Sequence, residues 1–270
     1  MNDLSVLMSL YHAESPLYLD ECLASLSSQT IKAEEVVLVI DGPISNALQA
    51  VVDKWIDPLN IHILPLKENV GLGSALNVGI KKCRNKLVAR MDTDDICLPN
   101  RFEEQLKLFS ANKNLAICGT SAEEVDPKSL LHISFRITPL SNIDIIKRLP
   151  YENPFNHPTV MFKKDAAISA GGYQDLPWME DWYLWIRILS AGYEGGNIPQ
   201  NLVKMRSGKD MISRRSGLEY VKSEWKITKI KKHYHLAASP KLLLIFLSRS
   251  LPRLLPHAVL RKIYLMYRKL

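Results

Sequence analysis

The chain contains the segment Leu87-Val88-Ala89-Arg90-Met91-Asp92-Thr93-Asp94-Asp95, in which a largely apolar run leads directly into three aspartates within four residues. The first five residues predict a buried strand. Carboxylates this close repel one another and lose hydration on burial unless a cation lies between them. Mg²⁺ typically binds one or two protein carboxylates and completes its shell with water and substrate phosphates. The segment therefore indicates a metal–diphosphate site, and the alternative is a solvated acidic turn that caps a helix.

Short apolar strands alternate with amphipathic helices around this segment. Strands are predicted at 4–10, 35–40, 61–66, 87–91 and 115–119, and helices at 18–28, 47–56, 73–83 and 101–109. This alternation predicts an α/β fold, with a mostly parallel sheet flanked by helices. Ligands of such sheets bind beyond the carboxyl ends of the strands. Three predicted strands end in suitable residues, at Leu10-Tyr11-His12, at Asp41 and at the aspartates.

The second half of the chain is less regular. Strands are predicted at 131–137 and 159–162, a turn at Gly171-Gly172-Tyr173, a helix at 181–191, and a strand pair at 193–198 and 202–206. No boundary is evident before residue 208. We therefore expect one catalytic-type domain over 1–208 and a basic, amphipathic helical tail over 209–270.

Composition favours a globular protein of the cytoplasm. The 270 residues are 47% hydrophobic, and the four cysteines form no CxxC pair, which is typical of reduced thiols. Met1-Asn2-Asp3 lacks the basic start of a signal peptide. The longest aliphatic or aromatic run, Leu242–Leu247, is far shorter than the roughly 20 residues that span a bilayer.

Positive charge is concentrated near the C-terminus. From Trp225 to Leu270 there are eleven lysines and arginines and no acidic residue. Since the whole chain carries +7, the part before Trp225 carries a net −4. Basic and apolar groups alternate in the tail, as in helices that lie on an anionic membrane surface. A helical cap with solvated charges is the alternative, and nucleic acid ranks behind both because no recognised binding module is present.

Six segments, in this order, resemble family 2 glycosyltransferases with the GT-A fold. They are Val6–Tyr11, Val36–Gly42, Asn69–Gly79, Asp92–Asp95, Leu98–Phe102 and Glu180–Trp185. The resemblance covers roughly residues 4–208. Asp41-Gly42-Pro43 and Asn156-His157-Pro158 make it most similar to bacterial exopolysaccharide and O-antigen transferases, including the amylovoran type.

The resemblance implies specific roles for individual residues. Asp94 would bind a divalent cation, Mn²⁺ or Mg²⁺, and Asp181 would be the catalytic base, supported by Glu180. The nucleotide sugar would contact Leu10, Tyr11, Glu14, Asp41, Asn69, Gly71, Asp92, Thr93, His157 and Arg206. The donor would be UDP-linked, although Ile40-Asp41-Gly42-Pro43 has one carboxylate fewer than the Asp-Asp-Gly-Ser often found there.

These roles fit the chemistry of sugar transfer. The attacking hydroxyl must lose a proton, which a carboxylate within hydrogen-bond reach can accept. The leaving nucleoside diphosphate needs no proton if a metal ion neutralises it. One metal site and one base therefore suffice, and a base opposite the leaving group implies inversion at C1. The alternative for Glu180-Asp181 is an acidic pair that stabilises a helix N-terminus.

Several of these residues also have a purely structural interpretation. Asp41 fits a plain turn, Asn69–Gly79 a tight loop, and a lone His157 a packing role. Arg206 fits either a diphosphate contact or solvated charge. Arg101 is interpreted as an ion-pair scaffold rather than a diphosphate contact, and Asn77 as a brace between loops.

The leading hypothesis from the sequence is a metal-dependent, inverting glycosyltransferase. It would move a sugar from a nucleotide diphosphate to a lipid-linked glycan at the inner face of the cytoplasmic membrane. A nucleotidyltransferase is a second hypothesis, but Ser9-Leu10-Tyr11-His12 is not the Gly-rich, basic loop expected after its first strand. A third is an inactive nucleotide-sugar-binding subunit of a membrane assembly.

Overall fold

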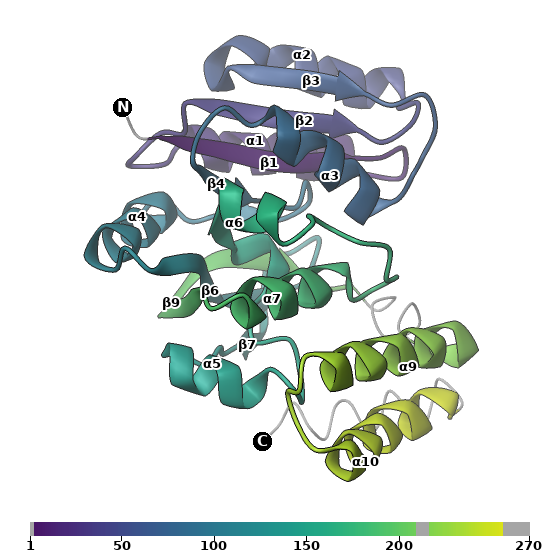
Figure 1. Cartoon of the computed structure of the whole chain (residues 1–270). Coiled ribbons are helices and arrows are strands. Elements are labelled where there is room, and N and C mark those ends of the chain that lie inside the picture. The colour runs from purple at the N-terminus through teal and green to yellow at the C-terminus, as the bar shows by residue number, and fades with distance from the viewer. Residues whose placement is uncertain (1–2, 209–215, 256–270) are drawn as a thin grey trace.

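A computed structural model describes residues 3–208 and 216–255 (Figure 1). Its strands form one mixed sheet in the order β3-β2-β1-β4-β8-β6-β9-β5, with β7 paired to β6. The strands are β1 (Leu4–Leu10), β2 (Glu35–Ile40), β3 (Ile61–Pro65), β4 (Leu87–Arg90), β5 (Ile96–Cys97), β6 (Leu115–Val125), β7 (His132–Arg136), β8 (Met161–Lys163) and β9 (Glu194–Arg206). The helices are α1 (Pro16–Ser27), α2 (Asn46–Leu59), α3 (Leu72–Lys82), α4 (Arg101–Ala111), α5 (Asn142–Arg148), α6 (Lys164–Ser169), α7 (Glu180–Ser190), α9 (Gly217–His233) and α10 (Ser239–Ser250). The predicted α/β fold is confirmed.

The first four strands pair in parallel, so their carboxyl ends meet at one edge of the sheet. The side chains of β1 and β2 are buried on both faces: in β1, Leu7 packs in the cluster that includes α3, and Val6 and Met8 in the cluster that includes α1 and α2. A Cβ at Gly79 of α3 would lie 2.4 Å from Leu7 Cδ1, so this helix needs glycine to approach β1. The predicted convergence of the three strand ends is confirmed.

Beyond β4 the sheet becomes mixed. β8 runs antiparallel to both β4 and β6, whereas β6 and β9 run parallel. Helix α7 covers this half, with the fully buried Trp185 in its middle. Phe155 and Phe162 each lie 5.9 Å from the Trp185 ring, between centroids.

Two predictions for the second half were wrong in detail. The expected strand pair is the single strand β9, because the segment around Pro199 forms a bulge: Ile198 faces Thr120 and Asn201 faces the next residue of β6. A bulge accommodates a proline, which cannot donate to the ladder. The strand expected at 159–162 begins at Met161, after a 3₁₀ turn at His157–Thr159. The short elements β5, α5 and α6 were not predicted.

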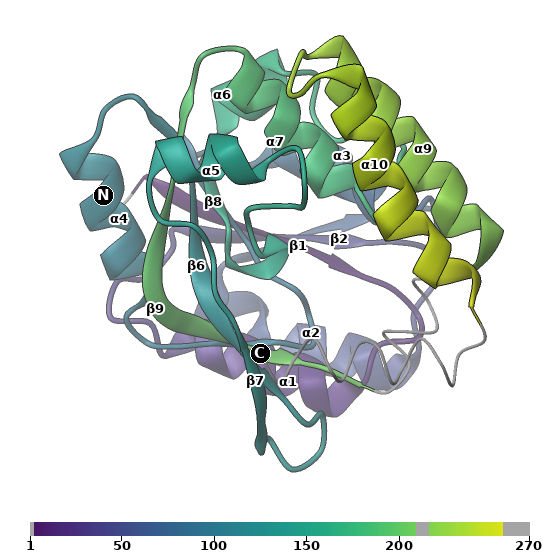
Figure 2. The same ribbon diagram turned by 90° about the horizontal axis from the view of Figure 1, so that it is seen from below.

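The described part of the tail forms two packed helices, α9 and α10, which lie beside α7 in Figures 1 and 2. Trp225 of α9 contacts Phe246 of α10, with ring centroids 5.1 Å apart. Among the described residues, every helix falls short of the length and hydropathy that a bilayer-crossing segment needs. The part of the predicted tail at 209–215 and 256–270 lies outside the described residues.

Candidate active site

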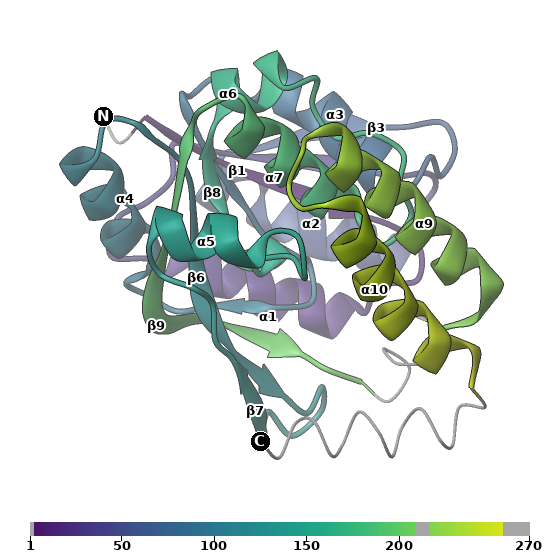
Figure 3. The ribbon, with the colours of Figure 1, turned by 60° about the horizontal axis from the view of Figure 1, so that its bottom comes forward.

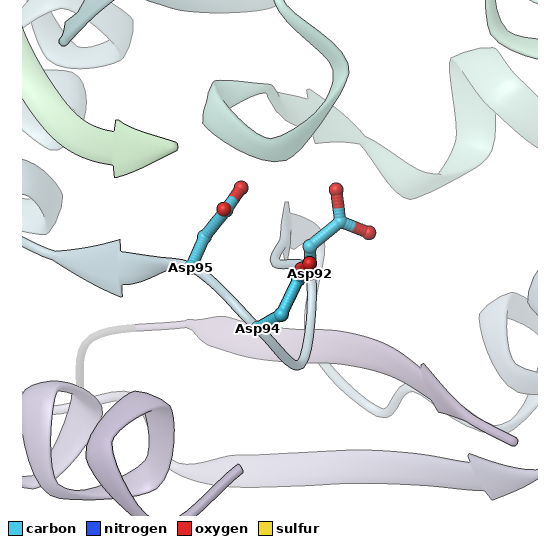
Figure 4. A group of neighbouring side chains, drawn as sticks. All are labelled: Asp92, Asp94 and Asp95. Carbon is cyan, nitrogen blue, oxygen red and sulfur yellow. The ribbon is translucent and has the colours of Figure 1, made fainter. Parts of the chain in front are cut away.

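Asp92, Asp94 and Asp95 form an acidic cluster directly after β4, at the ligand edge of the sheet (Figure 4). One carboxylate oxygen from each lies within 4.8 Å of the others. Burial, with the charges of Asp92 and Glu14, raises the pKa of Asp94 to about 7. Burial and Asp94 likewise raise the pKa of Asp95. Carboxylates held this way favour a bound cation, so the cluster fits a divalent metal with hard oxygen ligands.

Arg90, the last residue of β4, supplies positive charge to this cluster. Its side chain is 2% exposed and its Nη2 forms an ion pair with Asp92. The other two guanidinium nitrogens have no hydrogen-bond partner among the described residues. A buried cation within a strand is unusual, and this was the sequence signal that could have identified Arg90.

Arg101 supports the backbone beneath the cluster. Its Nη2 donates to the Arg90 carbonyl at 2.8 Å, and its Nε donates to Gln105 Oε1 at 3.0 Å. The side chain is fully buried. Arg101 is therefore a scaffold, as predicted, but the interactions seen for it in the described part of the chain are with neutral acceptors rather than a carboxylate.

The loop after β1 is tied to the aspartate turn. Thr93 Oγ1 donates to Glu14 Oε2 at 2.7 Å, and the Ser15 amide donates to the other oxygen of Glu14. Leu10 is fully buried in the core, whereas Tyr11 is 38% exposed at the edge. The structure thus brings Tyr11, Glu14 and Thr93 to the ligand edge, while Leu10 offers only its backbone there.

Asp41 anchors the loop that leads into α3. Its carboxylate accepts the amides of Val70 at 2.7 Å and Gly71 at 3.1 Å, and Asn69 Nδ2 donates to its carbonyl at 3.3 Å. Asp41 is only 3% exposed. Gly71 adopts φ +85°, which favours glycine. Asp41, Asn69 and Gly71 therefore lie together, with the Asp41 carboxylate engaged by the loop, and their contact with a nucleotide stays a prediction.

Arg206 closes the other side of the aspartate turn. Its amide donates to Asp95 Oδ1 at 2.8 Å. Its guanidinium, 2% exposed, donates to the Asp94 carbonyl, pairs with Glu21 and lies over the Tyr18 ring. The solvated interpretation of Arg206 was wrong, because these partners bury it against the turn that holds the acidic cluster.

Asp181 lies in the first turn of α7 and is 9% exposed. Its Oδ2 accepts from Asn153 Nδ2 at 2.6 Å, and its Oδ1 accepts the Trp182 amide at 2.7 Å. The neighbouring Glu180 packs against the start of α3, because a Cβ atom added at Gly73 would lie 3.4 Å from the Cβ atom of Glu180. Asn153 was not identified from the sequence, since nothing in Glu152-Asn153-Pro154 indicates a distant partner.

Tyr173 is buried beside His157 and Trp185. Burial raises its pKa, and the charges of Asp181, Glu180 and Asp92 raise it further. Asn77 Oδ1 accepts the Tyr173 amide at 2.8 Å, which confirms Asn77 as a brace.

His157 contacts the same phenol, with Nε2 at 2.9 Å from the Tyr173 hydroxyl. Burial and the nearby Arg90 hold the pKa of His157 well below its usual value, so the ring is neutral. It also packs 6.2 Å from the Trp185 ring. The structure therefore places His157 in the layer that supports the cleft, and its contact with a donor stays a prediction.

The parallel sheet, the acidic cluster at its carboxyl edge and a carboxylate on the facing helix define the GT-A class of glycosyltransferase. The comparisons with known proteins agree. The chain belongs to glycosyl transferase family 2, whose model matches residues 5–170.

Two relatives and one solved structure show how far the similarity extends. The chain is 44% identical over 260 residues to the amylovoran biosynthesis glycosyltransferase AmsE of Erwinia amylovora, covering 96% of this chain and 97% of AmsE. It is 39% identical over 241 residues to an Escherichia coli UDP-Gal:alpha-D-GlcNAc-diphosphoundecaprenol beta-1,3-galactosyltransferase, covering 86% of this chain and 82% of that enzyme. The fold matches Staphylococcus aureus TarS 1-349 in complex with UDP-GlcNAc, with a TM-score of 0.68, 18% identity and coverage of 91% of this chain and 72% of TarS.

Proposed function

We propose that this enzyme transfers a hexose from a UDP-linked donor to a lipid-linked glycan in the biosynthesis of a cell-surface polysaccharide. The relatives named above act in amylovoran biosynthesis and on a diphosphoundecaprenol-linked sugar. The observation that carries the proposal is the acidic cluster after β4 together with Asp181 in the first turn of α7, where the neighbouring Glu180 packs against the start of α3. The chain thus offers both a site for diphosphate and a base.

Asp94, with Asp92 beside it, would hold the divalent cation, Mn²⁺ or Mg²⁺. When bound, the cation neutralises the charge that develops on the departing diphosphate. Arg90 orients the Asp92 carboxylate through their ion pair. The loop pinned by Asp41 presents its backbone at the start of α3, where helix amides favour an anionic ligand.

The transfer itself is a single displacement. The acceptor hydroxyl oxygen forms a bond to C1 of the sugar while the bond from C1 to the diphosphate oxygen breaks with its electron pair. Asp181 accepts the hydroxyl proton, and Asn153 holds its carboxylate in place. Attack from the side opposite the leaving group inverts the configuration at C1.

The nature of the acceptor indicates where in the cell the enzyme acts. A lipid-linked glycan presents its sugar at a membrane surface, so we place the enzyme at the inner face of the cytoplasmic membrane as a peripheral protein. The basic, partly apolar helices α9 and α10 support this position.

Asp181→Asn tests the proposal. We expect kcat for transfer from UDP-galactose to a GlcNAc-diphospholipid to fall by about 10²–10⁴-fold, because the amide cannot accept the proton. UDP binding should remain, since Asp181 lies on helix α7, whereas the acidic cluster follows strand β4.

Asp165→Asn is the matched control. Asp165 also lies in the first turn of a helix, α6, but is exposed. It should keep normal turnover if Asp181 acts as a base rather than as a helix-stabilising charge. Equal turnover in the wild type and Asp181→Asn would refute the assignment.

A further inference from the structure

Helix α10 exposes a row of leucines on the side away from the body of the protein. Leu243, Leu244 and Leu247 are 49%, 67% and 39% exposed, while Leu242 and Ile245 are buried. Positions three and four residues apart fall on one side of a helix, so Leu247 lies on the same side as Leu244 and Leu243. The apolar surface of α10 is thus continuous along the helix.

Helix α5 exposes a second apolar surface. Ile143 and Ile146 are 66% and 41% exposed, whereas Ile145 is fully buried in the core. Ser141 caps the helix by accepting the Asp144 amide at 3.2 Å. Figures 2 and 3 show α5 and α10 on the same side of the molecule.

The turn after α5 joins the two helices. Lys241 of α10 lies over the Tyr151 ring, with Nζ 5.0 Å from the centroid. Arg249 of α10 donates from Nη1 to the Tyr151 carbonyl at 3.1 Å. Tyr151 is itself 42% exposed. Tyr151 therefore links the turn after α5 to α10, and the two apolar surfaces, which lie on the same side of the molecule, are here called the α5–α10 face.

Positive charge borders the α10 side of this face. Helix α10 exposes Lys241 and contains no acidic residue, while its Arg249 is paired with Glu224. On α5, the exposed Asp144 is followed by Lys147 and Arg148. The adjacent α9 exposes Lys226 and Lys229, and Lys229 lies 5.4 Å from the ring of the half-exposed Trp225. Scattered exposed leucines need no explanation, but an apolar face bordered by cations and tryptophan matches the headgroup region of an anionic bilayer.

The turn after α5 also leads to contacts with the candidate base, Asp181, and its neighbour. Asn153, two residues beyond Tyr151, donates to Asp181. Trp182, next to Asp181, donates from its indole nitrogen to the Leu149 carbonyl at 3.1 Å. A surface bound at the α5–α10 face would thus lie close to the residue that activates the acceptor.

We propose that the α5–α10 face, and not the tail alone, docks on an anionic phospholipid surface and brings the membrane-embedded acceptor to Asp181. This inference rests on the proposed function for the identity of the acceptor. Docking itself is independent of the reaction, because the face lies outside the acidic cluster.

Vesicle flotation measures the contributions of α5 and α10 to membrane binding separately. One variant carries Ile143→Gln and Ile146→Gln, and a second carries Leu243→Gln and Leu244→Gln. The matched control carries Val78→Gln and Ile168→Gln, which replace aliphatic residues of α3 and α6 that are 37% and 44% exposed. Vesicles contain phosphatidylcholine alone or with phosphatidylglycerol, and thermal melting checks that each variant is folded.

We expect the wild type and the control to float with the phosphatidylglycerol vesicles and not with the neutral ones. Each face variant should bind about tenfold more weakly or worse, because apolar insertion and charge act together. Normal binding by the α5 variant would overturn the composite face, and absence of binding by the wild type would overturn docking altogether.

Transfer assays keep the two proposals apart. With an acceptor that has a short, water-soluble tail, the face variants should retain wild-type turnover, whereas transfer to an acceptor embedded in vesicles should fall in parallel with binding. If the wild type floats but transfers to neither acceptor, the proposed function fails and the docking face stands. If the face variants lose transfer to both acceptors equally, the face does not act through the membrane.

Discussion

Two groups of charged side chains, opposite in sign, occupy different regions of the molecule. The acidic cluster of Asp92, Asp94 and Asp95 follows β4. The other group, here called the basic cluster, consists of Lys231 and Arg249 with Glu224, and joins α9 and α10 to Trp182 of α7.

The charges of the two clusters are balanced by different kinds of partner. Lys231 is 1% exposed, with its Nζ 3.7 Å from the Trp182 ring centroid, and Arg249 pairs with Glu224 at 2.6 Å. One carboxylate and one aromatic face thus balance two cations among packed helices. In the acidic cluster Arg90 balances only one of three carboxylates, at the edge where ligands bind. We infer that the acidic cluster binds a ligand, whereas the basic cluster holds α9 and α10 against α7.

The largest effect should follow from Asp94→Asn. Turnover should fall by about 10³-fold or more, because the cation that stabilises the leaving diphosphate loses its main ligand. Without metal, the variant should melt at a higher temperature than the wild type, since a repulsive buried charge is gone. Asp53→Asn, on the exposed surface of α2, should change neither quantity. A fall in metal-free stability would mean that the acidic cluster is structural.

Arg90→Met should leave the repulsion among the carboxylates of the acidic cluster without a compensating cation. Loss of the cation that pairs with Asp92 should lower the free energy of unfolding by about 2 kcal/mol in urea titrations. Mn²⁺ should restore part of this loss, because it replaces the missing positive charge. A variant as stable as the wild type would show that Asp92 does not depend on Arg90.

Glu224→Gln should produce the opposite pattern in the basic cluster. The change leaves Lys231 and Arg249 without their anion, so the free energy of unfolding should fall by about 2 kcal/mol. Turnover per folded molecule should stay within about twofold of the wild type, because the acidic cluster and Asp181 are untouched. A large loss of turnover at full folding would give the basic cluster a catalytic role.

Lys231→Met should give the smallest effect, and one that depends on pH. Burial, together with Arg249, lowers the pKa of Lys231 from 10.5 to about 7, against the opposing charge of Glu224. Between these values the unfolded chain binds a proton that the folded chain does not, so this contribution to stability rises with pH and is lost as pH falls to about 7.

The variant lacks this titration. It should therefore exceed the wild type in free energy of unfolding by about 1 kcal/mol near neutral pH, and the gain should shrink toward pH 10. Urea titrations at both ends of this window measure the difference. A gain that does not vary with pH would mean that Lys231 titrates normally.

The comparison also shows what a sequence can predict. Strand β2 was predicted because residues buried on both faces form a continuous apolar run, Val36–Ile40. The acidic cluster was predicted because its members are neighbours in the chain. The basic cluster was visible only as composition: nothing local indicates that Lys231 lies on Trp182.

The same limit applies within the candidate site. Asp181 was recognised from its motif, but its partner Asn153 lies 28 residues away. The Arg206 amide meets Asp95 across 111 residues, which is why Arg206 was interpreted as solvated. Such contacts depend on which distant segments the fold makes neighbours, and the local sequence pattern does not indicate them.

The most direct test is thermal melting of the wild type and Asp94→Asn with UDP, with and without Mn²⁺. We predict that UDP with Mn²⁺ at a hundredfold excess over the dissociation constant raises the melting temperature of the wild type by about 5 °C. UDP alone should have little effect, and Asp94→Asn should show no shift under either condition. An equal shift without metal, or an undiminished shift in Asp94→Asn, would contradict the assignment of the acidic cluster as a cation-dependent nucleoside diphosphate site.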